Sequence, residues 1–513
     1  GAVQIGNPIQ EKKMMDALLK ARDENLYSAI TDCGAGGLSS AVGEMGQELG
    51  ARVQLDKVSL KYQGLNYTEV WISESQERMV ISVPQNKIQR LKEIFSGENV
   101  EATVIGEFSG SKRLELFFQD CQVCDLDMAF LHNGHPKGMK EAVWAAPKLK
   151  KEKFSASPDL TESLFDILSH YNVCSKEWVI RQYDHEVQGA SVVKPLVGLK
   201  CDGPSDASVL APKLGSTKGI AIANGINPRY GMIDPYWMAA SCIDEALRQI
   251  VAVGGDVGRV AILDNFCWGN PDKPDRLGSL VRCAEGCYKI ALDYGVPFIS
   301  GKDSLYNEYT QGKRSIAIPG TILISAIGIV EDVTKCTTMD FKKPGNAIYL
   351  VGKTADELGG SVYLDTLGLL GEHVPKVDTK NGLQIFRALN KAVQQGLVAA
   401  MHDCSEGGLV TALAEMSFSG GWGATIRLDQ VPCLGKIRRD AVVAFAESNS
   451  RLIVEVAAEN QQRFEKLLKG IAWGNLGRVE KTPEFVVYGL DKKVCLNANI
   501  NDLKTAWKKP LQW

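Results

Sequence analysis

The sequence predicts an α/β protein of the α+β type with a duplicated domain, in the order B, A′, B′ along the chain. Three observations predict this class. Two motifs recur in the same order at nearly the same distance, each copy of the first motif lies between a short apolar strand and a helix, and a different unit separates the copies. The length of 513 residues also exceeds one ordinary core and suggests two to four domains.

The repeat has two parts. The Gly-rich turn Thr31–Leu38 returns as His402–Leu409, at an offset of 371 residues (32 to 403). The run Glu74–Ile81 returns as Glu447–Val454, at an offset of 373 residues (74 to 447). Either match alone would be weak, but two matches in order with little drift indicate duplicated domains.

The local patterns around the two turns agree. Apolar periodicity and strand signals predict the same elements in each copy. A strand, a Gly-Gly turn and a helix point backbone N–H groups at an anion, although glycines can also serve only to permit a tight turn. The expected pairs are helices 9–25 and 383–396, strands 28–31 and 398–402, and helices 38–49 and 409–418.

Composition sets the expected domain boundaries. The first B domain is expected over 1–147 and B′ over 341–513. The stretch 134–158 is rich in Lys, Pro, Gly and Ala and indicates a linker, which is assigned to 148–175, and A′ then covers 176–333. The expected strands of A′ are 220–223, 260–264, 296–300 and 321–330, and its expected helices are 235–253 and 277–294.

The bulk composition excludes several classes of protein. The chain is 45% hydrophobic and 23% charged, as is typical of soluble globular proteins. A net charge of −3 provides no basic field for nucleic acid or an anionic membrane, and no apolar run is long enough to cross a membrane. The thirteen scattered cysteines indicate reduced thiols, so we expect a cytoplasmic protein.

Several motifs resemble signatures of one enzyme family, the synthetase component of phosphoribosylformylglycinamidine synthase (formylglycinamide ribonucleotide amidotransferase). The resemblance implies domains like those of aminoimidazole ribonucleotide synthetase, in which an ATP-binding A domain precedes a B domain. It also implies that these residues are the last two thirds of the component, without the first A domain. The motifs are Val3–Pro8, Thr31–Leu38, Ser73–Met79, Phe130–Gly134, Asp264–Phe266 and Ser300–Ser304.

The resemblance implies an ATP-dependent C–N ligase of purine biosynthesis. In this family ATP phosphorylates the amide oxygen of formylglycinamide ribonucleotide, and ammonia then displaces phosphate to give formylglycinamidine ribonucleotide. The ammonia comes from glutamine through a glutaminase domain or subunit. The sequence contains no Gly-x-Cys-x-Gly glutaminase signature, so the glutaminase is expected as a partner.

The resemblance assigns roles to individual residues by their positions in the matched motifs. Asp32 matches a magnesium ligand, and a carboxylate suits Mg²⁺, although an Asp at a strand end can also be a helix cap. The resemblance implies that Asp264 and Gly301 contact ATP. Lys302 stands where the short form of the family commonly has an Asn that helps bind magnesium, and we assign it to ATP phosphate. The substrate positions are Gln4, Glu74, Ser75, Gln76 and Ser304, of which the first four could instead form a polar strand edge.

By the same comparison, the A′ domain lacks the catalytic and metal-binding groups of the family's A domain. With Pro228 set on the proline of the family's A-domain motif, the positions of its Lys, Glu and two His residues hold neutral groups, and Gln249 replaces a metal aspartate. We therefore expect no catalytic residue in this chain and no activity of the chain alone. The four neutral positions are Ala221, Ala223, Gly225 and Asn227.

Other interpretations stay open. A structural nucleotide could bind near Asp206 and the turn at 224–225, and the second copy at His402–Asp403 could be a relic. The chain could be a non-catalytic scaffold for ammonia delivery or assembly. It could also resemble a selenophosphate synthetase or thiamine-phosphate kinase, which the duplication disfavours. Whether the glutaminase is separate or fused, and whether the gene is split, is left open.

Overall fold

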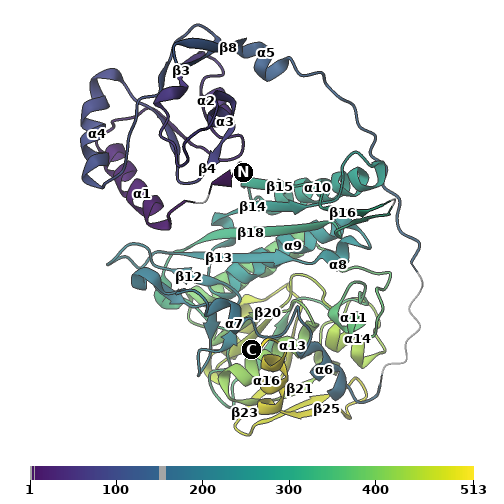
Figure 1. Cartoon of the computed structure of the whole chain (residues 1–513). Coiled ribbons are helices and arrows are strands. Elements are labelled where there is room, and N and C mark those ends of the chain that lie inside the picture. The colour runs from purple at the N-terminus through teal and green to yellow at the C-terminus, as the bar shows by residue number, and fades with distance from the viewer. Residues whose placement is uncertain (1–2, 5, 150–156, 313, 513) are drawn as a thin grey trace. The chain divides into compact units, whose positions relative to one another are not determined.

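The computed structural model describes residues 3–4, 6–149, 157–312 and 314–512 (Figure 1). These residues form two compact units, 1–139 and 140–513, and each unit is described by itself. Among the described helices, none combines the length and apolar character that crossing a bilayer requires.

The first unit contains two short two-stranded sheets, β1-β4 and β2-β5, and a four-stranded sheet in the order β6-β3-β7-β8. Its buried apolar residues form three separate small clusters. The strands are β1 (Val3–Gln4), β2 (Ala29–Asp32), β3 (Ala51–Gln54), β4 (Glu74–Ser75), β5 (Met79–Ser82), β6 (Gly106–Phe108), β7 (Arg113–Phe118) and β8 (Cys121–Asp127), and the α-helices are α1 (Pro8–Asp23), α2 (Leu38–Met45), α3 (Tyr67–Ile72), α4 (Ile88–Gly97) and α5 (Met128–Asn133).

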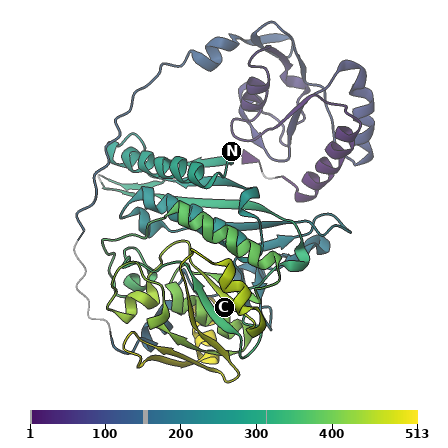
Figure 2. The same ribbon diagram turned by 180° about the vertical axis from the view of Figure 1, so that it is seen from behind.

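The second unit begins with a six-stranded sheet in the order β15-β14-β18-β13-β12-β9. Helices α9 and α10 cover one face of this sheet, as Figure 2 shows from behind. The strands are β9 (Ser191–Val193), β12 (Ser208–Leu210), β13 (Gly219–Ile226), β14 (Val260–Cys267), β15 (Phe298–Ser304) and β18 (Thr321–Val330), and the α-helices up to this point are α6 (Thr161–Leu168), α7 (Glu177–Ile180), α8 (Pro228–Gly231), α9 (Pro235–Ala252) and α10 (Pro274–Tyr294).

A seven-stranded sheet follows, in the order β20-β22-β19-β23-β21-β24-β25. Helix α9 contacts both sheets, and one continuous apolar core joins them, so A′ and B′ form a single unit. The strands are β19 (Ala347–Val351), β20 (Ala400–Asp403), β21 (Gly423–Arg427), β22 (Leu452–Val456), β23 (Trp473–Glu480), β24 (Glu484–Tyr488) and β25 (Val494–Asn499), and the α-helices are α11 (Val362–Thr366), α12 (Thr379–Gln394), α13 (Gly408–Gly420), α14 (Asp440–Phe445), α15 (Gln461–Leu467) and α16 (Ile500–Lys508). Short pairs β10 (Leu196–Val197)-β11 (Gly203–Pro204) and β16 (Glu308–Gln311)-β17 (Arg314–Ala317) complete the second unit's sheets.

The predicted elements are present with shifted ends. Helix α2 ends at Met45 rather than at 49, because Gly46 caps it. Helix α12 begins at Thr379 rather than at 383, because the side chain of Asp378 accepts a hydrogen bond from the Asn381 N–H and caps a polar first turn.

The structure differs from the linker predicted over 148–175. Helix α6 lies within that span, and its residues Leu164, Ile167 and Leu168 are buried at the i, i+3, i+4 spacing of an amphipathic helix. The backbone N–H of Leu160 also donates to the carbonyl of Cys495 at 2.7 Å. This part of the predicted linker is therefore packed into the second unit.

Candidate functional site

The Gly-rich turn of the first unit follows β2 and opens α2. Asp32 ends the strand with its side chain exposed. Gly36 and Gly37 have φ values of 79° and 59°, a conformation that favours glycine. A Cβ added at Gly37 would lie 2.1 Å from the carbonyl oxygen of Ser73, so the turn packs directly on the chain before β4.

Strand β4 holds the predicted substrate residues against this turn. The backbone N–H of Gly36 donates to Glu74 Oε1 at 3.0 Å. Ser75 is buried and pairs with Gln4 in the parallel β1-β4 ladder, while the side chain of Gln4 lies outside the described residues. Gln76 is exposed, and its amide donates to the carbonyl of Glu74 at 3.2 Å. The structure thus brings these predicted positions together beside Asp32.

Arg78 fastens the same loop, a role that the sequence analysis did not assign. Its Nε donates to the carbonyl of Ser75 at 3.1 Å, and its Nη2 donates to the carbonyl of Ser73 at 2.5 Å. Glu77 has a φ of 57° and pairs with Lys61 at 3.4 Å. The repeat carried a signal for Arg78, because Arg451 stands at its equivalent position.

The second copy has the same framework. The N–H of Gly407 donates to Glu447 Oε1 at 2.8 Å, and Nε of Arg451 donates to the carbonyl of Ser448 at 2.8 Å. Ser450, at the position of Glu77, also has a positive φ, of 54°. The two sites therefore share one backbone design.

The two copies differ in whether another domain covers the site. In the second copy, residues of A′ reach into it: the hydroxyl of Tyr230 donates to Glu447 Oε2 at 2.6 Å, and Nε of Arg248 lies 2.8 Å from Asp403 Oδ2. Arg248 also lies 2.8 Å from Asp244 Oδ1 through Nη1. Asp403, the equivalent of Asp32, is consequently buried in an ion pair.

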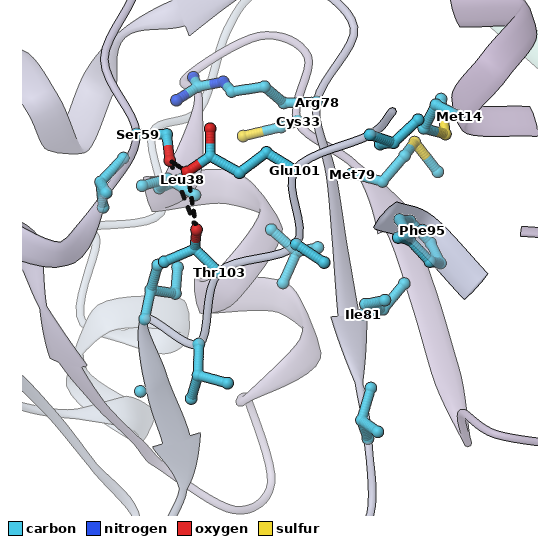
Figure 3. Close-up of a pocket in the computed structure, with 18 of the residues that line it drawn as sticks. Met14, Cys33, Leu38, Ser59, Arg78, Met79, Ile81, Phe95, Glu101 and Thr103 are labelled. Atoms are coloured by element: carbon cyan, nitrogen blue, oxygen red, sulfur yellow. Dashed lines mark hydrogen bonds between the residues drawn. The ribbon is translucent and has the colours of Figure 1, made fainter. Parts of the chain in front are cut away.

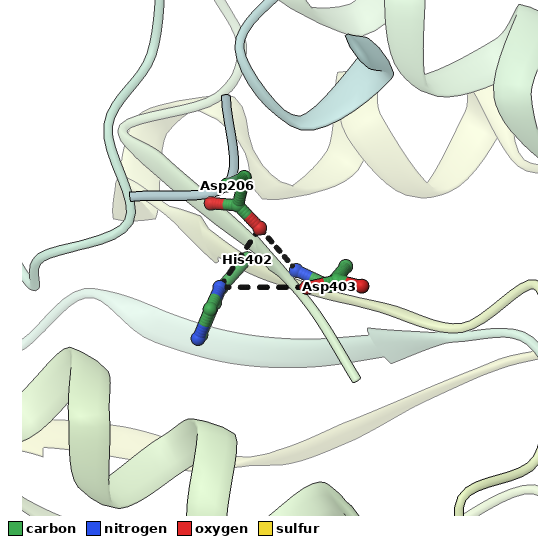
Figure 4. Close-up of side chains that lie close together, drawn as sticks. All are labelled: Asp206, His402 and Asp403. Carbon is green, nitrogen blue, oxygen red and sulfur yellow. Dashed lines mark hydrogen bonds and ion pairs between the residues drawn. The ribbon is translucent and has the colours of Figure 1, made fainter. Parts of the chain in front are cut away.

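His402 completes this buried network (Figure 4). Its Nδ1 lies 2.9 Å from Asp206 Oδ1, and its Nε2 lies 3.2 Å from Glu415 Oε2. Burial alone would lower the pKa of His402, but these two carboxylates raise it well above its ordinary value. Burial likewise opposes ionisation of Asp403, but Arg248 and His402 hold its pKa below the usual range.

The three residues in Figure 4 have the ligand types of a metal site. A protonated imidazole has no lone pair to offer a cation, however, and the carboxylate of Asp403 is already bonded to Arg248 and Ser405. Asp206 also accepts the N–H of Asp403 at 2.9 Å. The arrangement therefore balances charge within the protein.

The ATP residues predicted in A′ lie on neighbouring strands β14 and β15. Asp264 pairs in register with Gly301, and a Cβ at Gly301 would lie 2.5 Å from Asp264 Oδ1. Partial burial raises the pKa of Asp264. Lys302 is exposed at the sheet edge, and its Nζ donates to Ser304 Oγ at 2.8 Å. These residues belong to the second unit, and those around Asp32 belong to the first.

Small, closely packed residues stand at A′ positions where the family's A-domain motif has Lys, Glu and His. Ala221 and Ala223 are buried on β13, which packs against α9. A Cβ at Gly225 would lie 2.0 Å from the carbonyl oxygen of Cys242, so no side chain fits there without a backbone shift. The side chain of Asn224 accepts a hydrogen bond from Ser325 Oγ at 2.9 Å.

Comparisons with known proteins agree with this architecture. The family described as "AIR synthase related protein, C-terminal domain" matches residues 1–119 and 343–489. The family described as "AIR synthase related protein, N-terminal domain" matches residues 204–330. These matches confirm the predicted order of a B-type domain, an A-type domain and a second B-type domain.

Among curated proteins, the chain is 35% identical over its full length to phosphoribosylformylglycinamidine synthase subunit PurL of Deinococcus radiodurans, of which it covers 68%. It is 31% identical over 99% of its length to the subunit of the same name from Thermoplasma acidophilum, of which it covers 66%. The chain therefore spans about two thirds of the length of these relatives.

Solved structures of Thermotoga maritima PurL have the same fold. The structure complexed with ATP is 23% identical, with a TM-score of 0.63, and the match covers 94% of this chain and 68% of that one. The structure complexed with FGAR is 22% identical, with a TM-score of 0.64, and the match covers 93% of this chain and 66% of that one.

Proposed function

The chain belongs to the phosphoribosylformylglycinamidine synthase PurL family, and we propose that it supplies the substrate half of that ATP-dependent ligase. The reaction converts formylglycinamide ribonucleotide, ATP and glutamine-derived ammonia to formylglycinamidine ribonucleotide, ADP and phosphate in purine biosynthesis. The proposal assigns the working site to the first copy of the repeat. The second copy has a structural role.

The difference in cover between the two copies carries this proposal. Asp403 is buried beneath Arg248, whereas the equivalent Asp32 is exposed. The carboxylate of Asp403 in the second copy forms an ion pair with a cationic side chain of the protein. The carboxylate of Asp32 in the first copy is exposed and available to bind a ligand. In the second copy an A-type domain covers the site. We propose that another A-type domain, from the third of the relatives' length that this chain does not span, covers the first.

The residues of the first site suit the proposed ligands. Glu74, Ser75, Gln76 and Gln4 offer carboxylate, hydroxyl and amide groups to a ribonucleotide, and Glu74 keeps Oε2 for that purpose while Oε1 holds Gly36. Asp32 offers a hard oxygen of the kind that Mg²⁺ prefers. When bound with ATP, Mg²⁺ would neutralise phosphate charge.

On the A′ side, Asp264, Gly301 and Lys302 are proposed to contact ATP, and Ser304 the substrate. The Lys302 ammonium is exposed and can approach phosphate oxygens. Catalytic acid–base groups and a glutaminase are proposed to come from partners. The proposal keeps the domains 1–147, 176–333 and 341–513, and it limits the linker between the first two to the part of 148–175 that precedes α6.

A chimera tests this function. The N-terminal third of the Deinococcus radiodurans relative is fused ahead of this chain, and ADP formation is measured with formylglycinamide ribonucleotide, ATP, Mg²⁺ and ammonium. Gln76→Ala should lower kcat/KM for the ribonucleotide at least about tenfold through lost polar contacts. Gln47→Ala, also exposed in the first unit, is the matched control and should leave kcat/KM unchanged.

One observation favours a second function, a non-catalytic scaffold. Ala221, Ala223 and Gly225 leave A′ without the groups that phosphoryl transfer needs. A scaffold would give a chimera that folds but neither turns over nor loses ribonucleotide affinity on Gln76→Ala. That result would replace the ligase proposal.

A further inference from the structure

The motif Phe130–Gly134 forms helix α5 and the turn that ends it. His132 Nε2 lies 3.0 Å from the carbonyl oxygen of Gly43 on α2, the helix that follows the Gly-rich turn. The backbone N–H of Gly134 donates to the carbonyl of Phe130 at 2.7 Å, and a Cβ at Gly134 would lie 2.5 Å from the Phe130 ring. The motif therefore fixes α5 to α2 and ends it there.

Another part of α2 lines a cavity of about 820 Å³ in the first unit (Figure 3). Leu38 and Val42, which lie on one face of the helix, line this cavity together with Cys33 and Arg78. Among the described residues of 128–139, none lines it. Helix α5 therefore contacts α2 outside this cavity, and the chain that leaves α5 does not fill it.

Residues 140–144, which we call the strap, lie along the start of α10 in the second unit. The N–H of Val143 donates to the carbonyl of Pro274, the first residue of α10, at 2.9 Å. A Cβ at Gly278 would lie 2.2 Å from the carbonyl oxygen of Val143. The backbone of the strap therefore packs directly on the helix, and Trp144 beside it is partly buried.

Trp144 fixes the strap through a cationic side chain. The Arg282 guanidinium lies 4.0 Å from the centre of the Trp144 ring and 5.6 Å from that of Tyr236, which are cation–π distances. Asp234, the N-cap of α9, accepts two hydrogen bonds from the same guanidinium, each of 2.7 Å. The strap is thus joined to both helices that cover the A′ sheet.

The start of the strap lies beside the end of β15. Lys140 Nζ lies 2.6 Å from Asp272 Oδ1, and the hydroxyl of Tyr306 donates to Asp272 Oδ2 at 3.0 Å. Tyr306 follows Ser304, the last residue of β15, by two positions, and the carbonyl of Ser304 accepts the N–H of Trp268 at 2.8 Å. The strap is therefore anchored next to the strand end that carries the predicted A′ contacts.

The six residues 134–139 join the two fixed ends. They are exposed, and His135 Nδ1 lies 2.9 Å from the carbonyl oxygen of neighbouring Pro136. A chain of that length spans at most about 25 Å. If the strap were released, the next described residue packed on the second unit's core would be Leu149. The free chain would then be 134–148, and the effective concentration of one unit at the other would fall about fourfold.

We propose that α5, residues 134–139 and the strap form a tether that positions the two halves of the active site. His132 and Trp144 are its positioning residues, and they keep the substrate residues of the first unit at a high effective concentration at the ends of β14 and β15. The inference rests on the proposed function, which divides the site between the two units. A linker that only joined two domains would need neither fixed end.

Hydrogen exchange of the 513-residue chain, measured by mass spectrometry, tests the anchor. Residues 140–146 should be protected, and Trp144→Ala should speed their exchange at least about tenfold. Gly278→Leu should have the same effect from the helix side, because its side chain displaces the strap. Met139→Ala, at a side chain that is 99% exposed, is the matched control and should leave the rate unchanged. Exchange of 140–146 in the wild type at the rate of an unfolded chain would overturn the proposal.

X-ray scattering of the same chain tests the tether. A flexible Gly-Ser insertion of about 24 residues between Met139 and Lys140 should raise the radius of gyration by about 2 Å. The same insertion between Ala146 and Pro147 lies behind the strap and should leave the radius unchanged. In the Gly278→Leu background both insertions should raise it. Equal radii for the two insertions in the wild-type background would overturn the proposal.

The chimera tests whether the tether serves the site. The insertion before Lys140 should lower kcat/KM for ATP about tenfold, and the insertion behind the strap should leave it unchanged. Equal kcat/KM for the two insertions would overturn the positioning role. A chimera without turnover would count against the proposed function, whereas exchange and scattering would still decide whether the tether exists. The two failures are therefore distinguishable.

Discussion

Arg248 and Asp403 form a buried ion pair, with Nε 2.8 Å from Oδ2 and side chains 3% and 5% exposed. Asp403 stands in the repeat where Asp32 stands in the first copy. The pair joins α9 to β20 and so holds the A′ and B′ sheets in one unit. It also takes up the carboxylate that the first copy leaves exposed.

Removing Arg248 should destabilise the second unit strongly. Arg248→Met would leave Asp244 and Asp403 buried without their cation, which costs about 3–5 kcal/mol. Urea unfolding followed by circular dichroism should show a lower midpoint. Arg427→Met, which breaks an exposed pair with Asp429, is the control and should cost less than about 1 kcal/mol. Equal midpoints for the two variants would contradict the role of Arg248.

Glu406 should make the stability of the second unit depend on pH. Burial beside Glu447 raises the pKa of Glu406 from 4.5 to about 7. The folded state therefore holds this proton more tightly than the unfolded state. Its contribution is fully present below pH 4.5 and is lost as pH rises through about 7, amounting to about 2 kcal/mol after allowance for its partial exposure.

Glu406→Gln tests this dependence because it keeps the shape and removes the titration. The difference in urea midpoint between wild type and variant should change between pH 5 and pH 8, with wild type losing stability relative to the variant. Ala35 stands at the equivalent position of the first copy, so a carboxyl is not required by the turn. A difference that stays constant with pH would show that Glu406 does not titrate in this range.

Asp32 should matter for turnover and not for stability. In the chimera, Asp32→Asn removes the charge proposed for Mg²⁺ and should lower kcat by about two orders of magnitude. The melting temperature should stay unchanged, because the side chain is exposed. Asp56→Asn, another exposed Asp of the first unit, should affect neither quantity. Full activity of Asp32→Asn would remove this residue from the site.

Gly301 should be intolerant of a side chain for a local reason. The added Cβ of Gly301→Ala would lie 2.5 Å from Asp264 Oδ1 and force that carboxylate aside. In the chimera we expect KM for ATP to rise at least about tenfold with little change in melting temperature. Gly97→Ala has open space around its Cβ and serves as the control. An unchanged KM would exclude the proposed ATP contact.

The sequence predicted the duplication and the strand-turn-helix units because their signals are local. Apolar periodicity and glycines at 36–37 and 407–408 act within a few residues, and the structure places these glycines at positive φ. The buried face of α6 also had a local signal, at Leu164, Ile167 and Leu168, which the composition of the span concealed.

The cover over the second site could not be predicted from sequence. Arg248 and Asp403 lie 155 residues apart, and Tyr230 and Glu447 lie 217 residues apart. Only the packing of α8 and α9 against B′ brings these residues together. The sequence around Arg248 does not indicate that this side chain pairs with the carboxylate of Asp403.

The most direct measurement is ammonia-dependent ADP formation by the 513-residue chain alone, beside the chimera that adds the N-terminal third of the Deinococcus radiodurans relative. Both are assayed with formylglycinamide ribonucleotide, ATP, Mg²⁺ and ammonium. We predict turnover by the chimera and none by the chain alone, because the exposed first site needs an A-type domain. Robust turnover by the chain alone would contradict that requirement.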